Sequence, residues 1–310
     1  MGQVKEKQLG AMYFCGVATI SVLYLSQNNW LLSLLVCGSA TILLYAGKPV
    51  SQSRDALLIQ CLSYAVGIWN VLLMGRFARG ISDLYGISSP MPGILLLLLC
   101  AYGAKKKDLL SVSAIIALAM ATIMGILFLF ALPNINLRSI EVRNSAGIGM
   151  ISFGFFPTVA LYSYKEGKKN EALPWFGMGI LLTILVGLIT VGLGAENFYT
   201  ASMSVNLFGA MERLEPVVSA MVSAGAFCTM GCLFLVNNKI IGKEKNEKEI
   251  APQWVEFIVA TMVCIAGDKV PLRIWSLGTT VCWGVIPVIQ QGIVVCKENI
   301  KKVKKIEKSA

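Results

Sequence analysis

Histidine is absent from this 310-residue sequence. The chain therefore lacks a common zinc ligand, the base of a Ser–His catalytic pair and the one side chain that normally titrates near neutral pH. Nine cysteines are present, but almost all of them lie in apolar runs, where a thiol packs as a small hydrophobic group. We therefore expect no metal, no cofactor and no enzymatic activity.

Charged residues are also scarce. They make up 14% of the chain, against about a quarter in a soluble domain, while 56% of the residues are hydrophobic. The apolar residues form long uninterrupted blocks, such as 109–132 and 217–236. A helix can carry such a block across a bilayer because it satisfies its own backbone hydrogen bonds. The sequence predicts an all-α integral membrane protein.

Acidic residues are almost missing from the interior of these blocks, which weighs against a proton relay through intramembrane carboxylates.

We count ten apolar segments and predict ten transmembrane helices. They lie at about 9–26, 30–46, 56–74, 90–104, 109–132, 146–163, 173–195, 213–237, 253–267 and 274–296.

The basic residues predict the orientation of these spans. With the N-terminus inside, 20 of the 27 Lys and Arg fall on the cytoplasmic side, as the positive-inside rule expects. Both termini are then cytoplasmic, and residues 297–310 form a basic tail that attracts anionic lipid. The net charge of +10 is spread over short loops and this tail, instead of one continuous face, which weighs against a nucleic-acid partner.

Ten spans divide into two sets of five within a single transmembrane domain, residues 1–300. The first repeat covers about 9–132 and the second about 146–296. Because each half has an odd number of spans, the halves run in opposite directions through the membrane. This is the arrangement of inverted-repeat transporters.

Spans one and six, the first of each half, carry residues that favour an interrupted helix. A discontinuous helix exposes backbone groups that bind a zwitterion without a charged side chain. Close packing of small residues and an ordinary proline kink are the alternative. Ser219 and Ser223, four residues apart on span eight, would add hydroxyl ligands, although such hydroxyls more often bond to their own helix. The candidate residues in spans one and six are Gly16, Val17, Ala18, Thr19, Gly154, Phe155, Phe156 and Pro157.

Four stretches along the chain together form a recognisable pattern. They are Lys5-Glu6-Lys7-Gln8-Leu9 with Trp30, then Gly75-Arg76-Phe77 with Pro90 and Pro92, then Leu132-Pro133-Asn134-Ile135-Asn136-Leu137, and finally Tyr199 through Phe208-Gly209-Ala210-Met211-Glu212-Arg213-Leu214-Glu215-Pro216. In order and spacing this set resembles the spore germination permease family, the B-type subunit of endospore germinant receptors within the amino acid–polyamine–organocation superfamily.

The resemblance implies a ten-helix permease fold in which spans one and six are broken around a midplane site. It also implies an amino acid or similar small germinant as ligand, and other germinant-receptor subunits as partners in the cell membrane or inner spore membrane. Two alternatives stay open. One is a free-standing amino-acid transporter of the same fold, and the other is a structural subunit of a membrane complex that binds no ligand.

Overall fold

The computed structural model describes residues 6–25, 30–48, 50, 57–106, 108–135, 152–163, 169–194, 198, 215–240, 251–266 and 269–307. Helices form all the regular structure in these ranges. The elements are α1 (Glu6–Tyr24), α2 (Trp30–Ala46), α3 (Leu57–Leu84), α4 (Met91–Lys106), α5 (Asp108–Ala131), the 3₁₀-helix η2 (Leu132–Asn134), the 3₁₀-helix η4 (Ser152–Tyr162), α7 (Lys169–Gly192), α9 (Glu215–Ile240), α10 (Ala251–Ala266), α11 (Leu272–Thr279), the π-helix η7 (Thr280–Val285) and α12 (Ile286–Glu307).

Each of the ten predicted apolar segments overlaps a helical element in the described residues, the last with the combined α11, η7 and α12. Among the described residues, five helices are long and apolar enough to cross a membrane, which suggests a membrane-embedded protein. They are Leu57–Leu84, Val112–Ala131, Leu173–Gly192, Pro216–Ile240 and Arg273–Ile300. The other apolar helices are shorter. The 16 residues of α4, for example, rise only about 24 Å, against roughly 30 Å of hydrocarbon.

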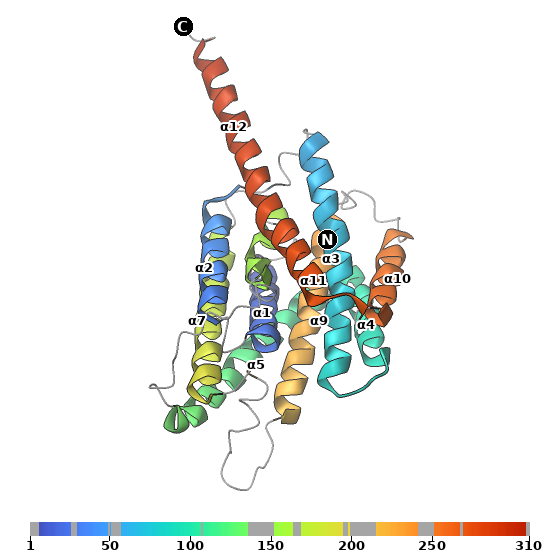
Figure 1. Ribbon diagram of the computed structural model, residues 1–310. Coiled ribbons are helices and arrows are strands. Elements are labelled where there is room, and N and C mark those ends of the chain that lie inside the picture. Colours follow the sequence, from blue (N-terminus) through green and yellow to red (C-terminus); the bar gives the residue numbers. More distant parts are fainter. Residues whose placement is uncertain are drawn as a thin grey trace.

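Side-chain contacts define the two ends of the bundle. At one end Lys48, just after α2, pairs with Glu298 of α12, and Lys239 of α9 donates to the carbonyl of Ser163 after η4 (2.8 Å). At the other end Tyr85, just after α3, bonds to Ser223 in the first half of α9 (2.9 Å). Figure 1 shows α12 leaving the bundle at the end where α3 begins.

Helix α1 lies at the centre of the bundle and packs against α5, α7, α9 and η4. Its side chains are buried all round, including Met12, Tyr13 and Cys15, each 0% exposed. A helix that is apolar on every face is suited to this enclosed position. A second group of helices surrounds α3, which packs against α4, α9 and α10.

The prediction that span one is discontinuous is wrong, because α1 continues as an α-helix through Gly16, Val17, Ala18 and Thr19. Thr19 donates its hydroxyl to the carbonyl of Cys15 (2.7 Å), a bond that fits regular helical geometry. A glycine at position 16 allows close packing between helices and does not interrupt α1. A Cβ at this position would collide with the ring of Phe156 in η4, so its glycine permits close packing.

Span six departs from α-helical geometry in a way that the sequence did not predict. Residues 152–162 form η4, a 3₁₀-helix of 11 residues, which is long for this type. It contains Pro157 and runs without a break, while the predicted start of the span, residues 146–151, lies outside the described residues. Pro157 has no N–H to donate to the carbonyl four residues earlier, which disfavours an ordinary α-helix in this segment.

Helix α12 continues to Glu307 as one helix, so the predicted basic tail begins as a helical continuation of span ten. The helix is preceded by the π-helix η7, and Pro287 follows two residues after η7 ends. Proline has no N–H, and its ring displaces the carbonyl four residues earlier, here that of Trp283. A π-helical turn is one of the few local structures that relieve such a conflict.

We expect Gly16→Ala to destabilise the protein by about 1–3 kcal/mol, because the added methyl group meets the packed ring of Phe156. Gly125→Ala in α5 is the matched control. A Cβ there has no neighbour within 4 Å, so stability should stay equal or rise by up to about 1 kcal/mol. Unfolding in mixed micelles measures both. A Gly16→Ala protein as stable as wild type would contradict the packing described here.

Candidate ligand pocket and the adjoining polar chain

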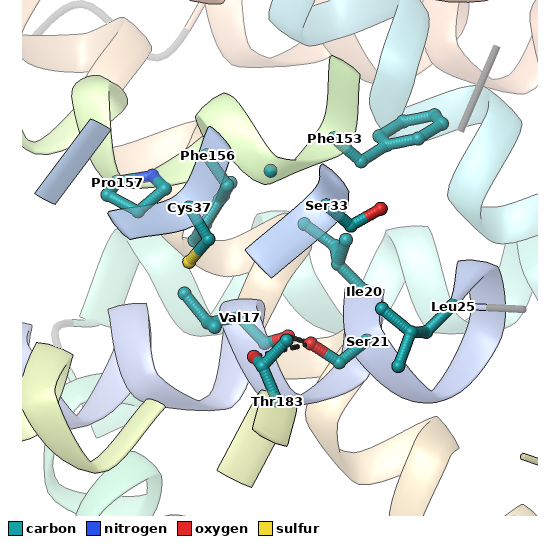
Figure 2. Close-up of a pocket in the computed structure, with 11 residues that line it drawn as sticks. Val17, Ile20, Ser21, Leu25, Ser33, Cys37, Phe153, Phe156, Pro157 and Thr183 are labelled. Atoms are coloured by element: carbon teal, nitrogen blue, oxygen red, sulfur yellow. Dashed lines mark hydrogen bonds between the residues drawn. The ribbon is translucent and has the colours of Figure 1, made fainter. Parts of the chain in front are cut away.

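A narrow pocket lies between α1, α2, η4 and α7 (Figure 2). Its empty volume is about 360 Å³, and only a small part of it is wide enough for a water molecule. The pocket is lined by Val17, Ile20, Ser21, Leu25, Ser33, Cys37, Phe153, Gly154, Phe156, Pro157 and Thr183. No charged side chain is among them.

Four of the residues predicted from sequence meet in this pocket: Val17 from α1, and Gly154, Phe156 and Pro157 from η4. Spans one and six are therefore brought together as expected, although 134 positions separate Gly154 from Ile20 in the chain. Gly154 allows η4 to approach α2 closely. A Cβ at this glycine would lie 3.0 Å from the carbonyl oxygen of Ser33.

The other predicted residues lie outside the pocket. Gly16 contacts the ring of Phe156, Thr19 approaches Gly225 of α9, and Phe155 packs against Gly284 of η7. Ala18 is buried and does not line the pocket.

Ser219 and Ser223 of α9 are also outside the pocket, near the end of α3. The Ser223 hydroxyl is 2.8 Å from the Ser219 carbonyl and 2.9 Å from the hydroxyl of Tyr85. The bond of Ser223 to its own helix is the alternative that the sequence left open. The two serines help to join α9 to α3.

The pocket contains hydroxyl groups that sequence reasoning did not select. Ser21 of α1 and Thr183 of α7 face each other with their oxygens 2.9 Å apart (Figure 2). Each hydroxyl also contacts a carbonyl of its own helix, that of Val17 (2.8 Å) and that of Gly179 (2.9 Å). Two hydroxyl protons serve three contacts, so the pair retains capacity to accept a hydrogen bond from a ligand.

The three-residue turn of η4 gives it three different faces. Gly154 and Pro157 face the pocket. Phe155 and Thr158 face η7. Phe156 lines the pocket with one edge and joins an aromatic cluster on the other side.

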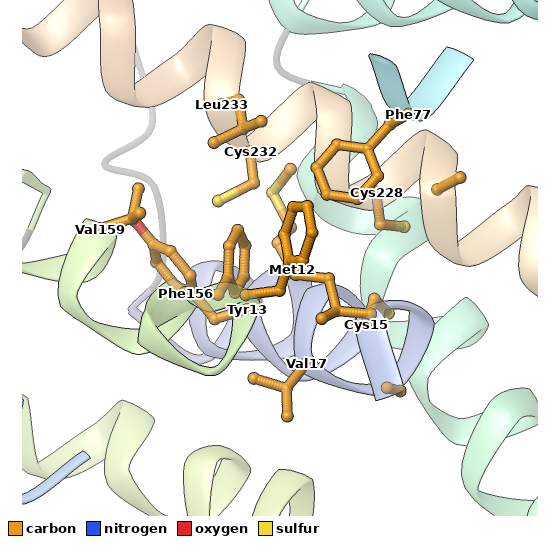
Figure 3. Packing of buried hydrophobic residues seen from close by; sticks show 14 of the residues in the cluster. Met12, Tyr13, Cys15, Val17, Phe77, Phe156, Val159, Cys228, Cys232 and Leu233 are labelled. Carbon is orange, nitrogen blue, oxygen red and sulfur yellow. The ribbon is translucent and has the colours of Figure 1, made fainter. Parts of the chain in front are cut away.

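This aromatic cluster fills the space between η4, α1, α3 and η7. The ring of Phe156 lies 5.7 Å from that of Tyr13 and 5.4 Å from that of Trp283, and Phe153 lies 5.8 Å from Phe77. Figure 3 shows Tyr13, Phe77 and Phe156 packed together beside Cys232 of α9. Phe156 therefore separates the pocket from a densely packed interior.

Thr158 of η4 begins a chain of buried polar groups. Its hydroxyl lies against the carbonyl of Trp283, the carbonyl to which Pro287 cannot donate. The same hydroxyl is 2.7 Å from the carbonyl of Phe155, so its single proton is placed between two acceptors. The η4 helix thus supplies the donor that the proline removes from η7.

The chain continues across the bundle through two asparagines. The indole N–H of Trp283 donates to Asn70 Oδ1 (2.8 Å), and Asn70 Nδ2 donates to Asn237 Oδ1 (3.1 Å). Asn237 Nδ2 then donates to the carbonyl of Gly67 (3.1 Å). Thr158, Asn70 and Trp283 are 0% exposed and Asn237 is 1% exposed. Because unpaired polar groups are costly in a low-dielectric interior, this chain joins η4, η7, α3 and α9 firmly.

No family model matches the sequence, and no curated protein is significantly similar to it. What the pocket can bind must therefore follow from its own residues.

Sequence reasoning missed Asn70, Asn237 and Gln290, although amides inside apolar runs are an available signal. Polar side chains at membrane depth are expensive, so they are seldom present without a partner or a role.

Replacing Asn70 by leucine should cost about 1–3 kcal/mol, because it leaves the Trp283 indole and the Asn237 amide without their partner. Adding Asn237→Leu should cost less than the sum of the two single changes, since the residues share one bond. Thr122→Val is the control, because that hydroxyl is exposed and bonds only within α5. Equilibrium unfolding in mixed micelles measures all four variants. Strict additivity of the two asparagine changes would show that the amides do not act together.

Proposed function

We propose that this chain is a permease-like subunit of a spore germinant receptor. In this proposal it binds a small zwitterionic molecule, such as an amino acid, and takes part in germination signalling. The observation that carries the proposal is the pocket in which Val17 of α1 meets Gly154, Phe156 and Pro157 of η4. The ordered sequence resemblance supplies the family.

The chemistry of the pocket suits a zwitterion better than an ion of net charge. The pocket reaches Phe153 and Gly154 in the first described turn of η4, and the backbone N–H groups of a helix N-terminus at this position would favour a carboxylate. The Ser21 and Thr183 oxygens would accept hydrogen bonds from an ammonium group. A net charge would have no counter-charge in the lining, and its burial would be unfavourable.

The packing of the helices supports an inverted repeat of five spans. Helix α1 packs on α7, and five spans later η4 packs on α2. Helix α3 packs on α10, and its counterpart α9 packs on α4. Replacing each span by the span five positions away also turns the contact of α1 with α5 into the contact of η4 with η7. A pseudo-two-fold relation between halves produces this reciprocity.

The basic residues support an orientation with both termini in the cytoplasm. Lys48 and Lys239 lie at one end of the bundle, where α12 also leaves it. On this proposal that end is the cytoplasmic one.

The narrowness of the pocket favours sensing over rapid transport. A ligand the size of an amino acid needs η4 to move away from α2 and α7, and the aromatic cluster behind Phe156 fills the adjoining interior. The same narrowness favours a second candidate, a structural subunit that binds no ligand.

A thermal-shift screen of the purified chain against the common amino acids, with and without sodium, tests the proposal. A binder should be stabilised by about 2.7 kcal/mol at a hundredfold excess of ligand over Kd. Stabilisation by one or two amino acids is the expected result. A flat screen with a folded sample would favour the structural subunit. Uptake of the stabilising amino acid into liposomes by the chain alone would instead favour a free-standing transporter.

Gly154→Val should abolish the shift given by the stabilising amino acid, because the new side chain collides with the Ser33 carbonyl and the Val36 side chain beside the pocket. Gly177→Val on α7 is the matched control, since a Cβ there has no neighbour within 4 Å. The control should keep the wild-type shift. If the Gly154 variant is folded and also keeps it, the ligand does not bind at η4.

A further inference from the structure

The last part of α12 is a basic helix that projects beyond the bundle (Figure 1). Residues 297–308 contain six lysines and two glutamates, so their net charge is about +4 at neutral pH. The lysines are Lys297, Lys301, Lys302, Lys304, Lys305 and Lys308.

The sequence of this extension divides it into two faces. Apolar residues recur every third position at 300, 303 and 306, and the helical repeat of 3.6 places them within one arc. The lysines at 301, 302, 304 and 305 occupy the opposite arc. Ile300 is 56% exposed, so this apolar face begins without a partner in the bundle.

Hydrogen bonds fix the direction in which the helix leaves the bundle. Gln291 accepts from the backbone N–H of Lys48 (2.7 Å) and donates to its carbonyl (2.6 Å), and the Lys48 ammonium pairs with Glu298. Gln290 accepts from the Tyr162 hydroxyl at the end of η4 (2.6 Å). One of the two acids of the extension, Glu298, is therefore paired with Lys48, just after α2.

We propose that residues 297–307 of α12 bind the anionic headgroups of the leaflet from which the helix emerges. The extension is continuous with a helix of spanning length, so the headgroups are always within its reach. Each residue adds about 1.5 Å along the axis, which keeps the first lysines within about one Debye length of the surface. Basic residues in this position each gain about 1 kcal/mol from an anionic leaflet.

The division of the extension into an apolar and a basic face also fits binding to the surface of a lipid leaflet. Apolar positions 300, 303 and 306 can rest at the boundary of the acyl chains while the lysines contact phosphate. A second copy of this chain is disfavoured, since it would set one lysine cluster against another. The proposal requires only that the chain is embedded in a membrane, and it does not depend on the ligand pocket.

Hydrogen–deuterium exchange of the intact chain in nanodiscs tests the proposal. One set of discs contains phosphatidylcholine alone, and the other contains about one third phosphatidylglycerol. We expect backbone amides of residues 297–307 to exchange more slowly in the anionic discs, on the order of tenfold, and high salt should remove the difference. Equal exchange in the two disc types would overturn the proposal. An acidic protein would then be the alternative binding partner for the lysines.

Two variants locate the effect on the extension. Changing Lys301, Lys302, Lys304 and Lys305 together to glutamine should abolish the protection by anionic lipid. Changing Lys105, Lys106 and Lys107 to glutamine should preserve the protection, although it removes a lysine cluster at the end of α4 that the sequence places on the same side of the membrane. Exchange in α1 and α9 reports whether each variant is folded. Protection that persists in the folded α12 variant would also overturn the proposal.

Discussion

The carbonyl of Trp283 has to find a donor inside the bundle, and much of the interior is arranged around that need. Pro287 cannot supply an N–H, so the chain passes through the π-helix η7 and the hydroxyl of Thr158 takes the donor's place. The indole N–H of Trp283 itself donates to Asn70 Oδ1. Thr158, Asn70 and Trp283 are all 0% exposed, so losing either bond would leave a buried polar group unpaired, and the two bonds hold η4, η7 and α3 together.

The 3₁₀-helix η4 is where these constraints meet the pocket. Its tight turn directs Thr158 to η7, Phe156 to the aromatic cluster and Gly154 to α2. A movement that widened the pocket would therefore act on all three contacts at once. Gln290 adds a link from the end of η4 to α12 through Tyr162, which connects the pocket region to the helix that leaves the bundle.

Much of the fold could be predicted from hydrophobicity, because long apolar blocks have few stable solutions in a bilayer. The helical elements of the described residues overlap the ten apolar segments found in the sequence, and Val17 meets Gly154, Phe156 and Pro157 as the sequence suggested. The unbroken α1 was not predicted. A small residue such as Gly16 permits either an unwound turn or a close neighbour, and only the position of Phe156 distinguishes the two.

The sequence by itself determined where the helices lie, that the protein is suited to a membrane, and which spans carry the flexible and small residues. These properties follow from composition and spacing along the chain. Tertiary structure alone decided that Ser21 faces Thr183, that Ser223 faces Tyr85 instead of the pocket, and that Asn70 pairs with Asn237. Such pairs join positions more than 100 residues apart, and their partners depend on how each helix is rotated about its axis, which packing fixes and periodicity does not.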